Sequence, residues 1–509
     1  MKHHSKARIE FGDFQTPDAL AVTVMRILAG RGLNPASIVE PTCGTGSLLT
    51  AAVKQFPKAQ QVIGLDINSK YLQSAAGGIG QLLPAGVARL LQVNFFTHDW
   101  QQEFAALKDP ILAVGNPPWA TSSQLAALKS TNVPAKSNHR NDRGLDAITG
   151  KANFDIAEWM VLRLIELLSE RQGALAMLLK TSVSRKILAH CWRERTPLAH
   201  ASLHLIDAAT HFDVDATACL LLCEFGSMRA AAECEVFDQH GRVTKTIGFE
   251  DGMLLADAPA FLRNRHLLRA GKLQASAYRW RSGIKHDCSA VMELTSTGTS
   301  LINGFGEEVN VDLACLYPML KGSAVGNPNS SNTNRYMLVP QHQTGEATES
   351  LQQTVPRTWA YLSRYAALLD DRGSTIYRNQ PRFSIFGVGP YTFAPWKVAI
   401  CGFYKHLNFR TIGPRDRKPV VFDDTVSFIS CDSFEEAMLL TQLLQSPPAQ
   451  DFLNALIFWD AKRPITADIL SKLDLLELAA ALNQEDALRN LRPSLPLRKC
   501  PQPAASLLF

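Results

Sequence analysis

The amino-terminal half of the chain alternates short apolar runs with segments of helical periodicity. Apolar runs of four to eight residues, bounded by turn residues, predict buried strands, and they occur at residues 37–40, 61–67, 90–96, 111–116, 174–180 and 218–225. Amphipathic patterns between and after them predict helices, at residues 18–30, 47–56 and 154–170. Strands that alternate with helices in this way indicate βαβ units around a parallel sheet, so we expect an α/β fold.

The pattern changes after about residue 235. Glycine, proline and asparagine interrupt the apolar runs more often, for example over 303–310 and 372–395. A chain of 509 residues has room for two to four domains of about 100–200 residues each. We expect a boundary between 226 and 260, and divide the chain into a first domain, 1–235, and a mixed α+β domain, 236–509.

Composition excludes several classes of protein. Hydrophobic residues make up 46% of the chain and charged residues 19%, which is typical of a folded protein and not of a disordered one. The chain has no apolar run of 18 residues and no apolar stretch near its start, so we expect neither a membrane span nor a secretory signal. The ten cysteines form no C-x-x-C pair, which indicates reduced thiols in the cytoplasm and no metal site.

Charge is distributed unevenly. The net charge of +5 is too small to indicate a partner by itself, but residues 355–420 contain eleven Lys and Arg, three Asp and twelve aromatic residues. Such interleaving suits phosphates and bases, although an aromatic core with a solvated basic edge would give the same pattern. A polar stretch at 120–152 is also basic. The candidate nucleic-acid contacts in these two stretches are Lys129, Lys136, Arg140, Arg143, Arg378, Arg382 and Lys397.

A glycine-containing turn follows the first predicted strand. The strand ends at Glu40, and the turn before the next helix holds Gly44 and Gly46. Glycine allows the backbone to turn tightly and to approach a ligand, which in an open α/β sheet lies beyond the strand's carboxyl end. Asp66 ends the next strand, where it can accept hydrogen bonds from a ribose or cap the following helix. Together the two features favour an adenosine-containing cofactor.

The segment after the strand at 111–115 carries the chemistry. Asn116-Pro117-Pro118-Trp119 is a stiff turn, because two prolines cannot extend a strand. It offers the Asn116 carboxamide and the Pro117 carbonyl as rigid acceptors for an exocyclic amine, and the Trp119 ring as a surface on which a base can stack. An Asn-Pro-Pro turn beside a core tryptophan is the alternative interpretation.

These motifs resemble those of S-adenosylmethionine-dependent DNA adenine-N6 methyltransferases of restriction–modification type. N-P-P-W resembles the catalytic N/D-P-P-Y/F/W motif of that family, and the motif order resembles its gamma arrangement. The resemblance implies a class I, Rossmann-like catalytic domain followed by a target-recognition domain. It implies S-adenosylmethionine as cofactor, with Phe14, Gln15, Thr16, Pro17, Glu40, Pro41, Thr42, Cys43, Gly44, Gly46, Asp66, Ile67, Asn94 and Phe95 as binding residues.

Two further residues are assigned by this resemblance. Asn94 stands where the family often has an aspartate that contacts the cofactor adenine, so the sequence departs from the pattern there. Phe212, in H-F-D-V-D-A-T-A, lies in a segment that resembles the motif supplying an aromatic residue against the target base.

The expected activity is methyl transfer to adenine N6 in double-stranded DNA, with the target base flipped out of the stack and no metal. A cytosine-C5 enzyme would need a thiol nucleophile, usually after proline, and the chain has no Pro-Cys dipeptide. RNA adenine-N6, DNA cytosine-N4 and protein glutamine methylation remain open, as does a recognition subunit of a larger defence complex. The chain begins at the cofactor motif, so we expect any cognate restriction endonuclease to be a separate chain. We expect a cytoplasmic, nucleoid-associated prokaryotic protein.

Overall fold

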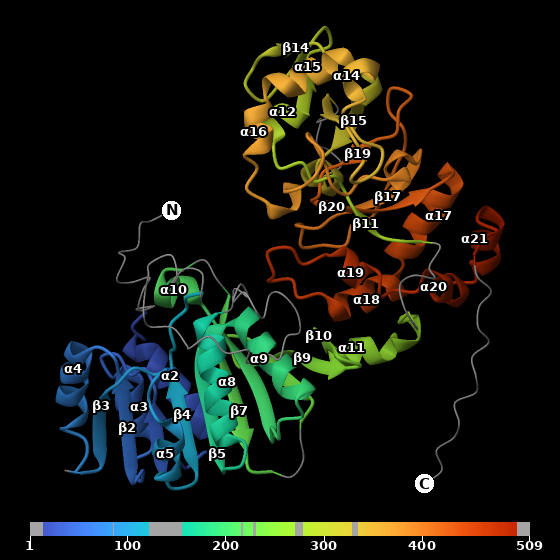
Figure 1. Cartoon of the computed structure of the whole chain (residues 1–509). Coiled ribbons are helices and arrows are strands. Elements are labelled where there is room, and N and C mark those ends of the chain that lie inside the picture. Colours follow the sequence, from blue (N-terminus) through green and yellow to red (C-terminus); the bar gives the residue numbers. More distant parts are fainter. Residues whose placement is uncertain are drawn as a thin grey trace. The chain divides into compact units, whose positions relative to one another are not determined.

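The computed structural model describes residues 14–84, 86–121, 155–214, 217–227, 231–269, 278–327 and 334–495. The chain forms two compact units, Met1–Ala258 and Pro259–Phe509 (Figure 1). Their boundary lies inside the expected interval of 226–260 but after residue 235. The first unit is longer because two further strands, described below, continue its sheet beyond that position.

The first unit is built on one mixed sheet. In the described residues ten strands follow the order β10-β9-β8-β6-β7-β5-β4-β1-β2-β3. The strands are β1 (Ser37–Glu40), β2 (Gln61–Asp66), β3 (Ala88–Gln92), β4 (Ile111–Gly115), β5 (Gly173–Lys180), β6 (His200–Ile206), β7 (Ala218–Phe225), β8 (Glu233–Phe237), β9 (Val243–Glu250) and β10 (Met253–Leu255). The helices are α2 (Asp18–Gly30), α3 (Ser47–Gln55), α4 (Ser69–Ile79), α5 (Trp100–Ala105), α8 (Ile156–Leu168), α9 (Thr181–Arg193) and α10 (Ala208–Phe212).

Helices cover both faces of the central strands (Figure 1). On one face, Ile38, Leu112 and Val114 share a buried cluster with residues of α2, α3 and α4. The alternate strand residues Val39 and Ala113 are also fully buried but lie outside that cluster, because successive side chains of a strand point to opposite faces. Helix α8 packs against β5, α5 and α9. Burial on both sides explains why these strands are continuously apolar in the sequence.

Strands β1 to β5 pair in parallel, whereas β7 runs antiparallel between β5 and β6. The expected α/β, class I methyltransferase fold is therefore confirmed. Neighbouring strands β1 and β4 are far apart in sequence, so the strand order reverses between them. In an open α/β sheet, ligands bind beyond the carboxyl ends of the strands at such a point. The glycine turn follows β1 and Asn116 follows β4, so the fold brings both motifs to this edge.

The elements expected from the sequence agree with the structure except at the third strand. We expected a strand at 90–96, whereas β3 ends at Gln92. The chain turns there because Asn94 Oδ1 accepts a hydrogen bond from the backbone N–H of Phe96 at 2.9 Å. Asparagine favours this local bond over a strand ladder, so the apolar Phe95 and Phe96 lie in a turn and not in a strand.

The second unit contains two smaller sheets. One has the order β11-β20-β17-β18 and the other β14-β13-β12-β16-β15-β19. Their strands are β11 (Arg281–Ser282), β12 (Glu293–Ser296), β13 (Leu301–Ile302), β14 (Glu308–Val309), β15 (Leu316–Leu320), β16 (Arg335–Leu338), β17 (Trp396–Cys401), β18 (Arg410–Ile412), β19 (Val421–Phe422) and β20 (Val426–Cys431). Leu294 and Met337 of the second sheet pack with Leu362 in one buried core.

Short helices surround these sheets. They are α11 (Ala258–Arg263), α12 (Ser289–Met292), α13 (Gly322–Gly326), α14 (Leu351–Thr354), α15 (Pro356–Arg364), α16 (Ala366–Asp370), α17 (Phe434–Gln445), α18 (Pro447–Leu456), α19 (Ala467–Leu470), α20 (Leu475–Ala481) and α21 (Glu485–Leu491). The unit is therefore of the mixed α+β type that the sequence indicated. In neither unit does a described helix have the length and apolar character needed to span a membrane.

Candidate active site

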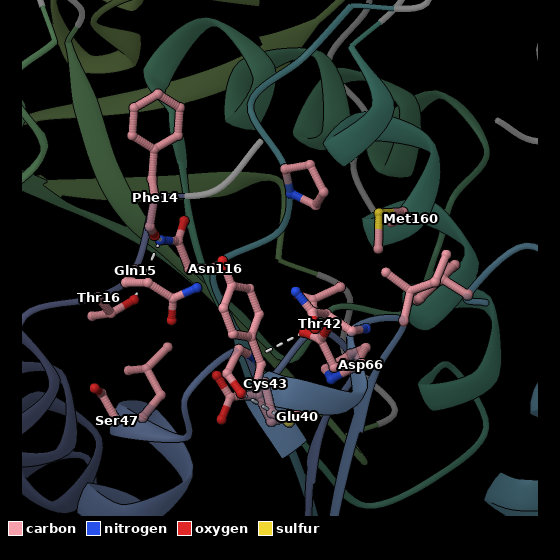
Figure 2. A pocket seen from close by; sticks show the side chains of 18 of the residues that line it. Phe14, Gln15, Thr16, Glu40, Thr42, Cys43, Ser47, Asp66, Asn116 and Met160 are labelled. Carbon is pink, nitrogen blue, oxygen red and sulfur yellow. Dashed lines mark hydrogen bonds between the residues drawn. The ribbon is translucent and has the colours of Figure 1, made fainter. Parts of the chain in front are cut away.

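A pocket of about 220 Å³ opens at the carboxyl edge of β1, β2 and β4 (Figure 2). Its walls bring together segments from the start of the described chain, the glycine turn, the end of β2, the turn after β3 and the end of β4. The lining residues are Phe14, Gln15, Thr16, Glu40, Pro41, Thr42, Cys43, Gly44, Ser47, Leu48, Asp66, Ile67, Asn68, Tyr71, Val93, Phe95, Phe96, Asn116, Pro118 and Met160.

The glycine turn is held in a conformation that favours glycine. Gly44 has φ +50° and Gly46 has φ +87°, both in the left-handed region. A Cβ on Gly44 would lie 2.5 Å from Gln15 Oε1, and a Cβ on Gly46 would lie 2.8 Å from the Cβ of Ala75. The two glycines thus let the turn pass close to the Gln15 side chain and to helix α4, and Gly44 lines the pocket.

Asp66 joins the end of β2 to this turn. Its Oδ2 accepts from the backbone N–H of Gly44 at 2.9 Å, and its Oδ1 accepts from the N–H of Asn68 at 2.7 Å. The capping interpretation is wrong, because Asn68 caps α4: its Oδ1 accepts from the N–H of Lys70 at 3.0 Å, whereas Asp66 accepts from the N–H of Asn68 itself. Each carboxylate oxygen can accept more than one hydrogen bond, so Asp66 can also accept from two vicinal hydroxyl groups in the pocket.

Glu40 is the most buried carboxyl group of the pocket. Glu40 is 2% exposed, and its Oε2 has no hydrogen-bond partner among the described residues. Burial raises the pKa of this carboxyl group well above its ordinary value. A buried acceptor without a partner is costly unless a ligand supplies a donor, so Glu40 fits a ligand that carries an amino or hydroxyl group.

The segment before α2 supports both motifs. Gln15 Oε1 accepts from the backbone N–H and from the hydroxyl of Thr45, each at 3.0 Å, which fixes the glycine turn from outside. The residues on either side of Gln15 hold the Asn-Pro-Pro turn: Asn116 Nδ2 donates to the carbonyl of Phe14 at 2.7 Å and to Thr16 Oγ1 at 3.3 Å. One short segment therefore sets the geometry of the glycine turn and of the Asn-Pro-Pro turn.

These contacts determine the orientation of the Asn116 carboxamide. A backbone carbonyl only accepts, so the nitrogen of the amide must point toward Phe14 and the oxygen away from it. Asn116 Oδ1 is buried and has no hydrogen-bond partner in the described part of the chain. The pocket therefore contains a rigidly held, unsatisfied carbonyl oxygen, which is an acceptor suited to an N–H donor.

Three aromatic rings pack beside Asn116. The Trp119 ring lies 5.8 Å from Phe14 and 5.1 Å from Phe212, measured between centroids. The Trp119 indole N–H donates to the carbonyl of Leu178 at 3.3 Å. Trp119 is 8% exposed and Phe212 is 3% exposed, and both belong to the buried cluster of the first unit. The two residues expected to stack on a base thus lie next to the pocket but with their faces covered.

Comparison with known proteins identifies the family. The chain is 44% identical over 478 residues to the type II methyltransferase M.NspV of a Nostoc species, covering 94% of this chain and 98% of that protein. This chain belongs to the type II methyltransferase family. Residues 1–184 of this chain also match the profile of the N-6 DNA Methylase family. The matched residues include the glycine turn and the Asn-Pro-Pro motif.

Solved structures are more distant from this type II methyltransferase. The methyltransferase subunit of a type I restriction–modification system from Streptococcus thermophilus is 16% identical, with a TM-score of 0.33 over 44% of this chain and 46% of that one. A putative class I S-adenosylmethionine-dependent methyltransferase from Listeria monocytogenes is also 16% identical, with a TM-score of 0.32 over 45% and 67%.

Most of the expected cofactor residues of the type II methyltransferase line the pocket, but six of the expected site residues do not, and two of these are Trp119 and Phe212. Pro17 precedes helix α2, Gly46 begins α3, and Pro117 lies outside the lining set. The Asn94 carboxamide is used by the local turn and does not line the pocket, whereas the neighbouring Phe95 does.

The candidate DNA contacts divide into three groups. Lys129, Lys136, Arg140 and Arg143 lie outside the described residues. Arg378 is exposed, and so is Arg382, which pairs with Asp370 at 3.1 Å. Lys397 is 1% exposed in β17, and its ammonium donates to the carbonyl of Ala394. This placement does not support the expected DNA contact, because the side chain is buried and its ammonium group is bonded inside the second unit.

Sequence reasoning missed several pocket residues of this methyltransferase. Asn68 and Tyr71 line the pocket and follow Asp66 closely, so their position after the acidic strand end was a usable signal. Met160 comes from helix α8, where an apolar residue at a core position carries no sign of a ligand. Only the packing of α8 against the sheet reveals its place in the wall.

Proposed function

We propose that this protein transfers a methyl group from S-adenosylmethionine to N6 of adenine in duplex DNA, as the modification enzyme of a restriction–modification system. The observation that carries the proposal is the buried, unpartnered Oδ1 of Asn116 in the wall of the pocket that also contains Asp66 and the glycine turn. An acceptor of this kind suits an amino group as substrate, and the family membership supports the reaction class.

The pocket residues fit the cofactor. Asp66 has acceptor capacity for the two ribose hydroxyl groups, and Glu40 offers a buried oxygen to an ammonium or hydroxyl group. Gly44 lines the pocket and brings no side chain into it, which allows a close approach of the ligand. When bound, S-adenosylmethionine supplies a methyl group on a positively charged sulfur. The chain's own residues must then orient the cofactor and the amine in line, since proximity and orientation provide much of the rate.

Asn116 and Pro117 act on the target amine. The lone pair of an exocyclic aromatic amine is delocalised into the ring, which makes the nitrogen a weak nucleophile. Hydrogen bonds from its two N–H groups to Asn116 Oδ1 and to the Pro117 carbonyl draw the nitrogen toward tetrahedral geometry. Because Phe14 and Thr16 already fix the Asn116 carboxamide, its Oδ1 does not have to reorganise during the reaction.

The target base must leave the duplex to reach this site, because N6 is paired inside the stack. We propose that Trp119 and Phe212 receive the flipped base. Their rings are buried against Phe14, so a base that stacks on Trp119 has to displace one of the other two rings. The second unit, with exposed Arg378 and Arg382, is proposed to bind the duplex around the target, and a cognate endonuclease would be a separate chain.

Product analysis tests this proposal. Purified protein is incubated with S-adenosylmethionine and with duplex DNA, single-stranded DNA or RNA, and the nucleosides are identified by mass spectrometry after digestion. We expect N6-methyladenine in duplex DNA. N4-methylcytosine, or methylation confined to RNA, would replace the proposal by one of the alternatives, and a chain that binds S-adenosylmethionine without methylating any of the three would indicate a recognition subunit.

A further inference from the structure

A partly buried ion pair contacts the Asn-Pro-Pro-Trp turn. Lys180 ends β5, and its Nζ lies 2.8 Å from Asp155 Oδ2 and donates to the carbonyl of Trp119 at 3.3 Å. The side chain of Asp155 is 7% exposed and that of Lys180 is 26% exposed. Neither residue was assigned a role in catalysis or cofactor binding above, yet one ammonium group links the turn to helix α8.

The fold explains why the three groups meet. Strands β4 and β5 are parallel neighbours, with Gly115 opposite Met177, so Lys180 and the turn after Gly115 lie at the same edge of the sheet. Asp155 is the residue before α8, and its Oδ1 accepts from the N–H of Ala157. The carboxylate therefore caps the helix with one oxygen and binds Lys180 with the other.

Backbone contacts continue this link on the other side of the turn. Thr121 and Asp155 form an antiparallel bridge, and the N–H of Ile156 donates to the carbonyl of Ala120 at 2.9 Å. The indole of Trp119 in turn donates to the carbonyl of Leu178 in β5. The residues after Asn116 are thus held by β5 and by the start of α8, whereas Asn116 itself is held by Phe14.

We propose that Lys180 is a positioning residue for methyl transfer. Its ammonium group bonds both to the Trp119 carbonyl and to the Asp155 carboxylate, and it thereby fixes the turn that presents Asn116 and Pro117. The proposal rests on the function proposed above. A carboxylate this buried is stable only when it is paired, so the Asp155 charge keeps Lys180 in place. Because the Lys180 ammonium bonds to both groups, it ties the position of the turn to the start of α8. A shift of about 1 Å in the turn is enough to slow a reaction that depends on orientation by about 100-fold.

The test compares Lys180→Met with a matched control, Lys186→Met. Lys186 pairs with Glu158 at 3.8 Å, so the control also removes an ammonium between α9 and α8, but from a pair that includes no residue of the turn. Single-turnover methylation with saturating S-adenosylmethionine and DNA reports the chemical step. We expect Lys180→Met to slow this step by about 10- to 100-fold, with dissociation constants for both ligands within about twofold, and Lys186→Met to leave it unchanged.

Two further variants separate positioning from loss of folding. Asp155→Asn keeps the helix cap and the side-chain volume but removes the charge, and we expect it to slow the step to a similar extent. The double variant with Lys180→Met should be no slower than either single variant, because both remove one link. Lys180→Arg should recover part of the rate, since it restores the positive charge and the hydrogen-bond donors.

Three outcomes would overturn the inference: a Lys180→Met rate within about twofold of the parent rate, an equal loss in Lys186→Met, or a rate loss matched by a lower folded fraction in thermal melts. The proposed function is judged separately, by the nucleoside that the parent protein produces. A parent that methylates cytosine would contradict the proposed function, and the rate comparison between variants would still decide the role of Lys180.

Discussion

The side-chain nitrogen of Asn116 donates to the backbone carbonyl of Phe14 at 2.7 Å, which joins two residues that are 102 positions apart. This bond determines which atom of the carboxamide is left for a substrate. It uses a donor and leaves the buried Oδ1 free to accept, so the orientation is set by the chain and does not depend on the ligand. The segment that contains Phe14 therefore fixes the orientation of the Asn116 carboxamide and also lines the pocket.

Replacement of Asp66 by Ala should mainly weaken cofactor binding. Hydrogen bonds to a charged acceptor contribute about 1.5–3 kcal/mol, so we expect the dissociation constant for S-adenosylmethionine to rise by about 10- to 100-fold in calorimetry. Asp99→Ala is the control, because the Asp99 carboxylate likewise accepts a hydrogen bond from a backbone N–H near the start of a helix but does not line the pocket. An unchanged constant in Asp66→Ala would mean that this residue serves only the local turn.

The two glycines of the turn should differ in their tolerance of alanine. A Cβ on Gly44 meets the end of the flexible Gln15 side chain, which can move, whereas a Cβ on Gly46 meets the Cβ and Cα of Ala75 at 2.8 and 3.1 Å. We expect Gly46→Ala to lower the melting temperature more than Gly44→Ala. The opposite order in thermal melts would show that α4 shifts more easily than the Gln15 side chain.

Lys397 gives a pH-dependent prediction. Burial lowers the pKa of Lys397 from 10.5 to about 7. At a pH between these two values, the unfolded chain therefore binds a proton that the folded chain does not. The resulting loss of stability is absent above pH 10.5, grows as the pH falls and is complete below pH 7. Lys397→Met should therefore stabilise the protein at pH 7 by at least about 2–4 °C, and by less at pH 9.

The exposed Lys405 provides the matched control for this measurement. Lys405→Met removes the same charge from the net balance without a buried group, so its melting temperature should follow that of the parent at both pH values. A Lys397→Met variant with a difference that does not shrink between pH 7 and pH 9 would contradict the assignment of the effect to this ammonium group.

Arg378 and Arg382 remain the candidate DNA contacts that are both described and exposed. If both bind phosphates, the double Ala variant should bind duplex DNA more weakly, and the slope of log K against log salt should fall by about 0.9 for each lost contact. Lys397→Met should leave affinity and slope unchanged, because that ammonium is buried. An unaltered slope in the double variant would place the duplex contacts elsewhere in the chain.

The expected elements of the first unit agree well with the structure because their signals lie in residues that are neighbours in the sequence. The central strands β1, β2, β4 and β5 are largely apolar and buried, and the glycine turn and the Asn-Pro-Pro turn each follow one of them directly. Strand order then brings both to one edge. The third strand was misplaced at its end because Phe95 and Phe96 extend the apolar run, whereas the Asn94 side chain closes a turn that hydrophobic periodicity does not reveal.

Other features could not be predicted because they depend on which face of an element is buried. Lys397 and Arg382 occupy the same basic and aromatic stretch, yet Lys397 is buried in strand β17 whereas Arg382 is exposed. The aromatic residues Trp119 and Phe212 carry a recognisable motif, but their packing on each other is a tertiary contact. The link between Lys180 and Asp155 is likewise made by neighbouring strands and not by neighbouring sequence.

The most direct test of the account is a pair of measurements on Asn116→Ala. We assign Asn116 Oδ1 to the target amine and not to the cofactor, so we expect the single-turnover rate of methyl transfer to fall by at least about 100-fold. The dissociation constant for S-adenosylmethionine should stay within about twofold of the parent value in calorimetry. Retention of most of the rate, or a loss of cofactor affinity in proportion to the loss of rate, would contradict the account.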